Sequence, residues 1–217
     1  AVASGAAALQ PRLARVFLAA QIPVMEGYGL TETSPVLAVN EEANDGVRIG
    51  TCGRPLDNVQ IKIADDGEIL AKGPNVMLGY YKNEEATKEV FTEDGWFKTG
   101  DVAHLDAGYY KILGRSSVDI IKSGGYKLSA LEIEEVLRIH PDIEDCGVVG
   151  LPDEEWGEVV AAVLVLKNVI SKEEINTWLR ERLPGYKVPR LYQFVEELPR
   201  NAMGKVTKKD VVNLIKN

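Results

Sequence analysis

The chain has 217 residues, of which 45 % are hydrophobic and 27 % are charged, and its net charge is −8. This length allows one large domain or two small ones. The acidic balance argues against a nucleic-acid partner and against a protein that binds anionic membranes.

Two histidines and two cysteines leave little material for a histidine-based zinc site or a Ser-His-Asp triad. Neither cysteine belongs to a Cys-x-x-Cys pair, so we expect two reduced thiols. No apolar run approaches the length of a membrane span. We therefore expect a cytoplasmic protein without a transmembrane segment.

The first thirty residues predict a helix followed by a short buried strand. The helix lies in "SGAAALQPRLARVFLAAQ", with Leu13, Val16, Phe17 and Ala20 on one face, and the strand is "IPVMEGYG". Such a β–α unit, entered halfway, suggests a piece of a longer chain. We expect its apolar faces to associate with a missing N-terminal segment or with a second copy.

Short β segments separated by turn signals follow, up to residue 114. "NVQIKIADDGEILAKGP" predicts a hairpin that turns at Asp66-Gly67, and "EDGWFKTGDVAHLDAGYYKILGR" adds turns at Asp94-Gly95 and Ala107-Gly108. Within the second stretch, we interpret "KTGD" as a further turn. A twisted antiparallel sheet or a small distorted barrel is the expected result.

After Arg115 the pattern becomes mixed α and β. Ser129 and Ser171 each stand three residues before a glutamate, which predicts two capped helices, and "CGVVGL" and "VVAAVLVLK" predict buried strands. The predicted fold is therefore α/β and α+β. The change of pattern places a domain boundary at residues 115–118, between a β-rich part (1–114) and an α+β part (119–217).

Two phosphate-binding motifs are excluded by their departures from the pattern. "GYGLTE" begins like a dinucleotide-binding loop but carries Glu32 in place of the third glycine. "MGKVT" resembles the end of a P-loop, but Val206 replaces the residue that binds Mg²⁺. Tyr28, Asp101, Arg115 and Lys205 each have an ordinary structural explanation when taken alone.

Taken in order, four motifs resemble the adenylate-forming superfamily, which contains acyl-CoA synthetases, carrier-loading adenylation domains and luciferases. The motifs are "GYGLTETSP" (27–35), "GWFKTGDVA" (95–103), "GRSSVDIIKSGGYKLSALEIEEVL" (114–137) and "LPRNAMGKVTKK" (198–209). The resemblance covers the last part of the family's large domain (1–114) and all of its small, mobile domain (119–217), and it implies a hinge at 115–118. It implies a ligase that joins a carboxylic acid to CoA with ATP, through acyl-AMP.

The resemblance also implies roles for single residues in the first step. Tyr28 would pack against adenine beside Gly29, Thr31 would bind the α-phosphate, Glu32 would hold Mg²⁺, and Asp101 would accept hydrogen bonds from the ribose. Arg115 would approach the same sugar. Lys205 would enter the site by a domain movement and bridge the carboxylate and phosphate oxygens.

For the second step the resemblance implies that the loop "KSGGYK" reaches the active site. Gly125 would leave room for the pantetheine arm of CoA, and Gly124, Lys122 and Lys127 would meet its phosphate. An ordinary β-hairpin turn remains the alternative for the two lysines. The pivot would be Ser116 or Ser117, where many members carry a charged residue.

Two classes of carboxylic acid remain possible as the substrate, fatty acids and malonate. The first motif resembles fatty-acyl-CoA ligases and the later ones resemble malonyl-CoA synthetases, but Gly27 stands where the latter usually carry an arginine. We favour a fatty acid over malonate on that ground. A carrier-loading module and a non-catalytic binding module are further alternatives, and the absence of a following Gly-x-Ser attachment site favours free CoA.

The family's Ser/Thr/Gly-rich loop for the β- and γ-phosphates does not occur in these residues. We therefore expect the 217-residue chain to be inactive by itself.

Overall fold

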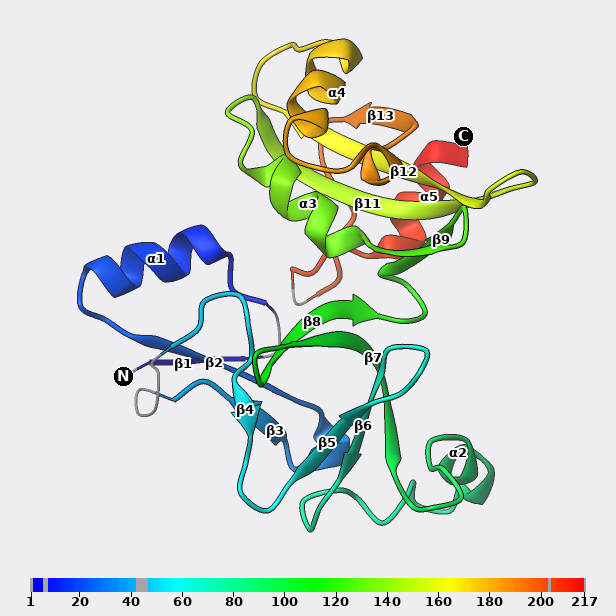
Figure 1. The fold of residues 1–217 in the computed structure, drawn as a ribbon. Coiled ribbons are helices and arrows are strands. Elements are labelled where there is room, and N and C mark those ends of the chain that lie inside the picture. Colours follow the sequence, from blue (N-terminus) through cyan, green and yellow to red (C-terminus); the bar gives the residue numbers. More distant parts are fainter. Residues whose placement is uncertain (1, 6–7, 42–46, 203, 217) are drawn as a thin grey trace. The chain divides into compact units, whose positions relative to one another are not determined.

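A computed structural model describes residues 2–5, 8–41, 47–202 and 204–216 of the chain (Figure 1). The chain divides into two compact units, residues 1–112 and 113–217. Both units mix helices with sheets that are mainly antiparallel, as the sequence predicts. None of the helices in the described part of the chain combines the length and the apolar character that a membrane crossing requires.

The first unit contains two four-stranded sheets. One has the order β1-β2-β3-β4, in which β1 runs parallel to β2, and the other has the order β5-β6-β7-β8. The elements are β1 (Val2–Ser4), α1 (Pro11–Ala19), β2 (Val24–Gly29), η1 (Thr31–Thr33), β3 (Val36–Val39), β4 (Arg54–Pro55), β5 (Gln60–Ile63), β6 (Glu68–Lys72), α2 (Glu84–Glu89), β7 (Phe97–Asp106) and β8 (Tyr109–Arg115), which ends just beyond the unit.

The predicted hairpins are confirmed. β5 and β6 pair in antiparallel register around the turn at Asp66-Gly67. Between β7 and β8, Ala107 and Gly108 have φ values of 48° and 87°, which are typical of the mirror-image turns that suit the twist of a hairpin. The alternation of apolar and polar residues therefore identified the strands correctly.

Helix α1 forms where the sequence predicts a helix, but the residues that the structure describes leave its apolar face uncovered. Leu13, Val16 and Phe17 keep 45 %, 59 % and 40 % of their surface exposed, whereas Ala14 is buried. In a stable protein such a face normally packs against another element. The expected uncovered surface is therefore present.

The second unit is a five-stranded sheet between helices. Its main path is β10-β9-β12-β11, and β13 pairs with β12 in parallel. The elements are β9 (Ile120–Ser123), β10 (Tyr126–Ser129), α3 (Ala130–Arg138), β11 (Ile143–Asp153), β12 (Gly157–Leu166), α4 (Lys172–Arg180), η2 (Gly185–Lys187), β13 (Leu191–Val195) and α5 (Lys208–Lys216).

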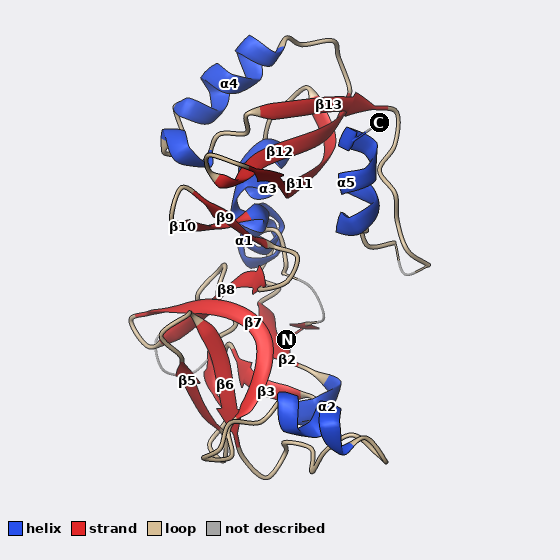
Figure 2. Cartoon of the chain, turned by 90° about the vertical axis from the view of Figure 1, so that its right-hand side faces the viewer, coloured by secondary structure: helices blue, strands red, loops and turns tan. Residues whose placement is uncertain are grey.

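Strand β12 supplies side chains to two apolar cores, one on each face of this sheet. Val160, Ala162 and Leu164 pack with residues of α3 and α4, while the alternate residues Ala161 and Val163 belong to the cluster that includes Val211 of α5, Leu198 and β11 residues. Figure 2 accordingly shows α4 and α5 on opposite sides of the strands. Because both faces are covered, β12 reads as a continuous apolar run in the sequence.

The predicted helix caps are present, with one difference. Ser171 and Glu174 form a reciprocal capping box at α4, as expected. Ser129 accepts a hydrogen bond from Glu132 N at the start of α3, but the carboxylate of Glu132 binds Lys187 Nζ at 2.7 Å. Glu132 therefore ties α3 to η2, the short helix before β13.

Candidate functional site

The loop after β2 folds tightly on itself. A Cβ atom added at Gly29 would lie 1.6 Å from the carbonyl oxygen of Pro35, so only glycine fits there. The buried hydroxyl of Thr33 accepts a hydrogen bond from Leu30 N and donates to Pro35 O at 2.8 Å. Asn75 then fixes the loop from outside by donating to Thr33 O and Val36 O. The exposed Thr31 therefore lies on a rigid loop.

Glu32 of this loop is held by residues around position 80. Its backbone carbonyl accepts from Met77 N at 2.7 Å, and its carboxylate accepts from the hydroxyl of Tyr80 at 3.0 Å. Tyr80 and Asn75 were not among the site residues expected from the sequence. Both lie in "GPNVMLGYY", whose Gly and Pro signals indicated only a loop.

Tyr28 and Asp101 are brought together although 73 positions separate them. The hydroxyl of Tyr28 donates to Asp101 Oδ2 at 2.7 Å. The ring of Tyr28 also packs against two buried apolar clusters, which include Leu37 and Ala38. Burial, followed by the nearby charge of Asp101, raises the pKa of Tyr28 far above its usual range, so the phenol stays neutral and keeps donating.

The interpretation of "KTGD" as a turn is wrong: these residues belong to the continuous strand β7. Between Leu70↔Lys98 and Glu68↔Val102 the pairing shifts, since two steps along β6 match four along β7. Gly100, with a φ of 74°, takes up this bulge and donates its N–H to Glu68. A bulge changes the direction in which side chains point. Directly after this bulge, Asp101 accepts the hydrogen bond from the Tyr28 hydroxyl.

In the second unit, "KSGGYK" forms the hairpin between β9 and β10. Lys122 and Lys127 are directly paired in its register and both are exposed. Gly124 and Gly125 form the turn with φ values of 56° and 81°. The geometry agrees with the structural alternative, a β-hairpin turn, and places two lysines side by side at its base.

An aromatic and cationic surface, which was not predicted from the sequence, lies beside this turn. The Arg190 guanidinium lies 4.0 Å from the centroid of the Trp156 ring, and the rings of Tyr126 and Tyr186 stack at 4.7 Å. These four side chains line a cavity of about 50 Å³ together with Gly124. Trp156 and Arg190 lie far apart in sequence, so no local motif joins them.

Lys205 lies on a short hairpin. Arg200 and Val206 form a β-bridge, and Asn201 N donates to Lys205 O at 2.9 Å. Gly204 has a φ of 77°, and residue 203 lies outside the described residues. Lys205 itself is exposed.

The segment expected to act as the hinge is a tight turn. Asp119 N donates to Arg115 O at 2.8 Å, and Asp119 Oδ2 accepts from Arg115 N at 3.0 Å. Arg115, Ser116 and Ser117 are exposed. The boundary between the two compact units falls between residues 112 and 113, a few positions before these serines. It does not identify either serine as the pivot, which stays a prediction.

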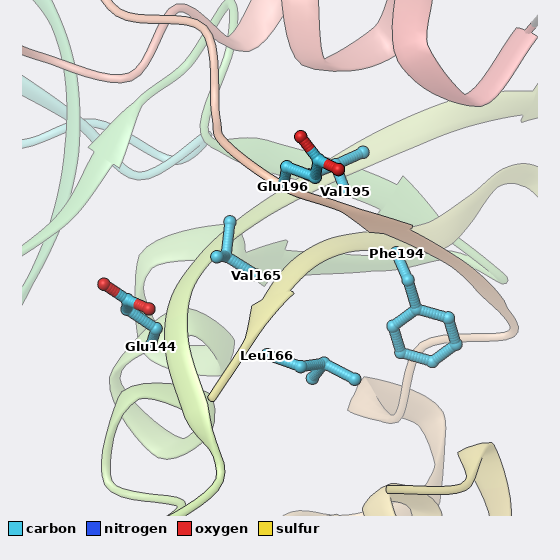
Figure 3. Close-up of a pocket in the computed structure, with 6 residues that line it drawn as sticks. All are labelled: Glu144, Val165, Leu166, Phe194, Val195 and Glu196. Carbon is cyan, nitrogen blue, oxygen red and sulfur yellow. The ribbon is translucent and has the colours of Figure 1, made fainter. Parts of the chain in front are cut away.

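A further cavity, which lies in the second unit, contains none of the expected site residues. It measures about 460 Å³, and its walls come from β11, β12, β13 and the residue after β13 (Figure 3). Two of its six lining residues are the carboxylates Glu144 and Glu196, and the other four are apolar. A nucleotide phosphate would be repelled there, so this cavity is not the nucleotide site.

The fit of Mg²⁺ depends on Glu32. Among the described residues, no three His, Cys, Asp or Glu side chains gather closely enough to hold a metal. A magnesium ion that bridges phosphates needs only one or two carboxylates from the protein, because phosphate and water oxygens complete its shell. The partly exposed Glu32, oriented by Tyr80, fits that requirement.

Comparison with known proteins agrees with the four motifs. Residues 1–81 match the family model described as AMP-binding enzyme, and residues 132–205 match the AMP-binding enzyme C-terminal domain. A malonate–CoA ligase of Arabidopsis thaliana is 44 % identical over 214 residues, which cover 89 % of this chain and 35 % of that protein.

Two solved structures resemble the chain closely. ATP-bound MatB from Rhodopseudomonas palustris is 35 % identical, with a TM-score of 0.86 over 97 % of this chain and 44 % of that one. The o-succinylbenzoate CoA synthetase MenE from Bacillus subtilis, in complex with the acyl-adenylate intermediate OSB-AMP, is also 35 % identical, with a TM-score of 0.86 over 96 % and 45 %. The chain thus spans less than half the length of these relatives, and it belongs to the adenylate-forming superfamily of AMP-binding enzymes.

Proposed function

We propose that this chain is part of an acid–thiol ligase. In the first step a carboxylate attacks the α-phosphorus of ATP, which forms acyl-AMP and releases pyrophosphate. In the second step the thiol of CoA attacks the acyl carbon, which forms the thioester and releases AMP. The observation that carries the proposal is the hydrogen bond between Tyr28 and Asp101, because it unites the first two motifs at one place.

The first unit supplies groups suited to an adenylate. Asp101 is 9 % exposed and is oriented by Tyr28, so it can accept hydrogen bonds from ribose hydroxyls. Thr31 offers a hydroxyl to a phosphate oxygen from the rigid loop. Because much of the Tyr28 ring packs inside the unit, only its remaining surface is available to adenine.

Magnesium would supply neutralisation of the phosphate charge when it is bound. Glu32 would hold it, with Tyr80 fixing the carboxylate. The attacking carboxylate needs no general base, so we expect catalysis through positioning and charge neutralisation. Lys205 fits that role, since its ammonium stands at an exposed hairpin tip.

The second unit supports binding of CoA. Lys122 and Lys127 can meet phosphate groups near the Gly124–Gly125 turn, and Arg190 adds a third cation over Trp156. Such a mixture of planar rings and cations suits a nucleotide that carries phosphates. A carrier-loading module, the alternative, has no need for a nucleotide surface of this kind.

The acid that the ligase activates is either one with a second carboxylate or a fatty acid. Relatives that act on malonate and o-succinylbenzoate support a substrate with a second carboxylate. They do not support the fatty acid favoured from the first motif. With Gly27 at the position of the expected arginine, the cation that pairs with a second carboxylate would come from elsewhere in the whole protein.

The uncovered apolar face of α1 supports the expectation that another protein segment packs against it. We propose that the rest of the large domain, or a second copy of this chain, covers Leu13, Val16 and Phe17. The chain alone is then expected to be inactive. This proposal concerns a whole ligase of which the present chain supplies less than half.

The test replaces the matching segment of the Arabidopsis malonate–CoA ligase with this chain and measures AMP release by mass spectrometry. The panel contains malonate, o-succinylbenzoate, acetate and palmitate, each with ATP, Mg²⁺ and CoA. Acid-dependent AMP release that disappears in the Lys205→Ala variant supports the ligase. A folded chimera that is silent with every acid favours the non-catalytic binding module, and turnover by the 217-residue chain alone contradicts the need for a partner segment.

A further inference from the structure

Lys208 is a lysine almost enclosed by its own unit. Its side chain is 13 % exposed, and Nζ donates to the carboxylate of Glu134 and to Val148 O at 2.8 Å. Asp119 Oδ1 lies 3.9 Å from the same nitrogen. These contacts join the first residue of α5 to α3, to β11 and to the turn after Arg115.

Glu134 is the centre of this network. Its side chain is 3 % exposed, and it accepts hydrogen bonds from Val148 N at 2.8 Å and from Arg138 at 2.9 Å, in addition to Lys208. A buried carboxylate with these partners is held in one place, and removal of a partner is strongly unfavourable. Lys208 is therefore attached to a fixed point of the small unit.

The hairpin of Lys205 ends directly before Lys208. Thr207 N donates to Pro199 O at 2.9 Å, which closes the hairpin base, and Arg200 binds both Gly204 O and the carboxylate of Asp145 on β11. One strand of the hairpin is thus tied to β11 through Arg200. The other strand passes through Thr207 into Lys208, which ties it to Glu134.

Asp119 extends the same connection to the expected hinge. Its carboxylate contacts Lys208 and also accepts from Arg115 N at 3.0 Å. A single ammonium group thereby contacts two acidic residues, one in the turn after Arg115 and one in α3. No sequence motif links these positions, since Asp119 and Lys208 are 89 positions apart (208 minus 119).

We propose that Lys208 is a positioning residue for Lys205. Lys208 fixes the hairpin base to α3 and to the turn after Arg115. Lys205 therefore keeps a constant position within the small unit when that unit moves. This inference rests on the proposed role of Lys205 in adenylation. Lys208 itself need not touch the reacting groups, because Glu134 and Asp119 already surround it.

The test measures the hairpin directly, without any activity. The purified chain is treated with trypsin under native conditions, and cleavage of the Lys205–Val206 bond is followed by mass spectrometry, together with hydrogen exchange of a peptide spanning 199–207. Lys208→Met is compared with Lys208→Arg, which keeps the charge, and with Lys209→Met, which changes an exposed neighbour. We expect cleavage and exchange to rise about tenfold in Lys208→Met, much less in Lys208→Arg, and not at all in Lys209→Met.

A variant that weakens the whole unit separates local from global effects. Ile175→Ala removes a fully buried side chain of α4 from the core cluster that includes α3, β11 and β12 residues. It is compared with Lys208→Met at temperatures at which both are equally far below their melting midpoints. Equal cleavage of the Lys205–Val206 bond in the two variants overturns the proposal, as does unchanged cleavage in a folded Lys208→Met protein.

The chimeric ligase adds a readout for function. Lys208→Met is expected to slow acyl-AMP formation about tenfold, while thioester formation from supplied acyl-AMP and CoA stays near the parent rate. If the hairpin loosens but acyl-AMP formation is unaffected, the positioning role is wrong. If the parent chimera forms no acyl-AMP while the hairpin loosens as expected, the ligase assignment fails and the structural link stands.

Discussion

The hydroxyl of Tyr28 donates a hydrogen bond to Asp101 Oδ2 at 2.7 Å, and this contact joins strand β2 to the bulge in strand β7. Asp101 is 9 % exposed, and its backbone N–H donates a hydrogen bond to Thr99 Oγ1 at 3.1 Å within the bulge. The carboxylate is therefore oriented before any ligand arrives. Such preorganisation lowers the entropy lost when a carboxylate binds a pair of hydroxyls.

Tyr28→Phe tests this contact. We expect the first unit to lose about 1 kcal/mol of stability, because a carboxylate of low exposure loses a hydrogen-bond donor. Urea unfolding measures the change, and weaker binding of ATP by the chimeric ligase is the expected functional result. Tyr81→Phe is the matched control, since Tyr81 is 87 % exposed, and its stability should equal that of the parent. Equal stability of the Tyr28→Phe variant contradicts the orienting role.

Much of the fold was predictable because alternation and turn residues act locally. Asp66-Gly67 and Ala107-Gly108 mark their hairpins, and Ser171 with Glu174 marks the start of α4. The bulge at Gly100 was missed, since "KTGD" has the composition of a turn and only its pairing with β6 identifies it as strand. The partner of Glu132 was missed for a similar reason, because Lys187 is 55 positions away.

The candidate site was predictable only where a family motif carries it. Tyr28, Asp101 and Lys205 stand in such motifs, whereas Tyr80 and Trp156 do not stand out by composition or spacing. Their significance depends on contacts made across the fold: Tyr80 with Glu32, and Trp156 with Arg190. Side-chain contacts between distant segments leave no periodic signal in one sequence.

The two glycines of the β9–β10 turn are expected to differ in their tolerance of alanine. Both have positive φ, so alanine at either position costs about 1 kcal/mol of backbone strain. A Cβ at Gly124 would in addition lie 2.9 Å from the Trp156 ring, whereas one at Gly125 meets nothing within 4 Å among the described residues. Urea unfolding should therefore show a larger loss for Gly124→Ala. The order Gly125→Ala worse than Gly124→Ala would contradict the position of the Trp156 ring.

Both thiols are expected to be inert in the folded chain. Desolvation by burial raises the pKa of Cys52 and of Cys146 from 9.0 to about 12. At pH 8.5 iodoacetamide should therefore modify them at least about 100-fold more slowly in buffer than in urea, because only the thiolate reacts. Rapid modification of the folded chain would contradict the burial.

The same shifts make stability depend on pH. Because the folded-state pKa values lie above the unfolded ones, the contribution of the neutral thiols is fully present below pH 9 and is lost as the pH rises towards 12. The melting midpoint should fall over this interval. A Cys146→Ala variant should show a shallower fall, which thermal unfolding at a series of pH values measures. An identical slope in the variant would show that other groups cause the fall.

Lys205→Ala separates function from stability. The side chain is exposed, and alanine keeps the two backbone hydrogen bonds by which this residue contacts Asn201, one donated by Lys205 N and one accepted by Lys205 O. The melting midpoint should therefore match that of the parent, and trypsin should no longer cleave at this position. In the chimeric ligase, acyl-AMP formation should fall at least about 100-fold, because the ammonium that neutralises developing charge is absent. Lys208→Met is expected to show the complementary pattern, with a mobile hairpin and an intact Lys205. Retention of acyl-AMP formation in Lys205→Ala would remove the lysine from the proposed mechanism, and with it the purpose assigned to Lys208.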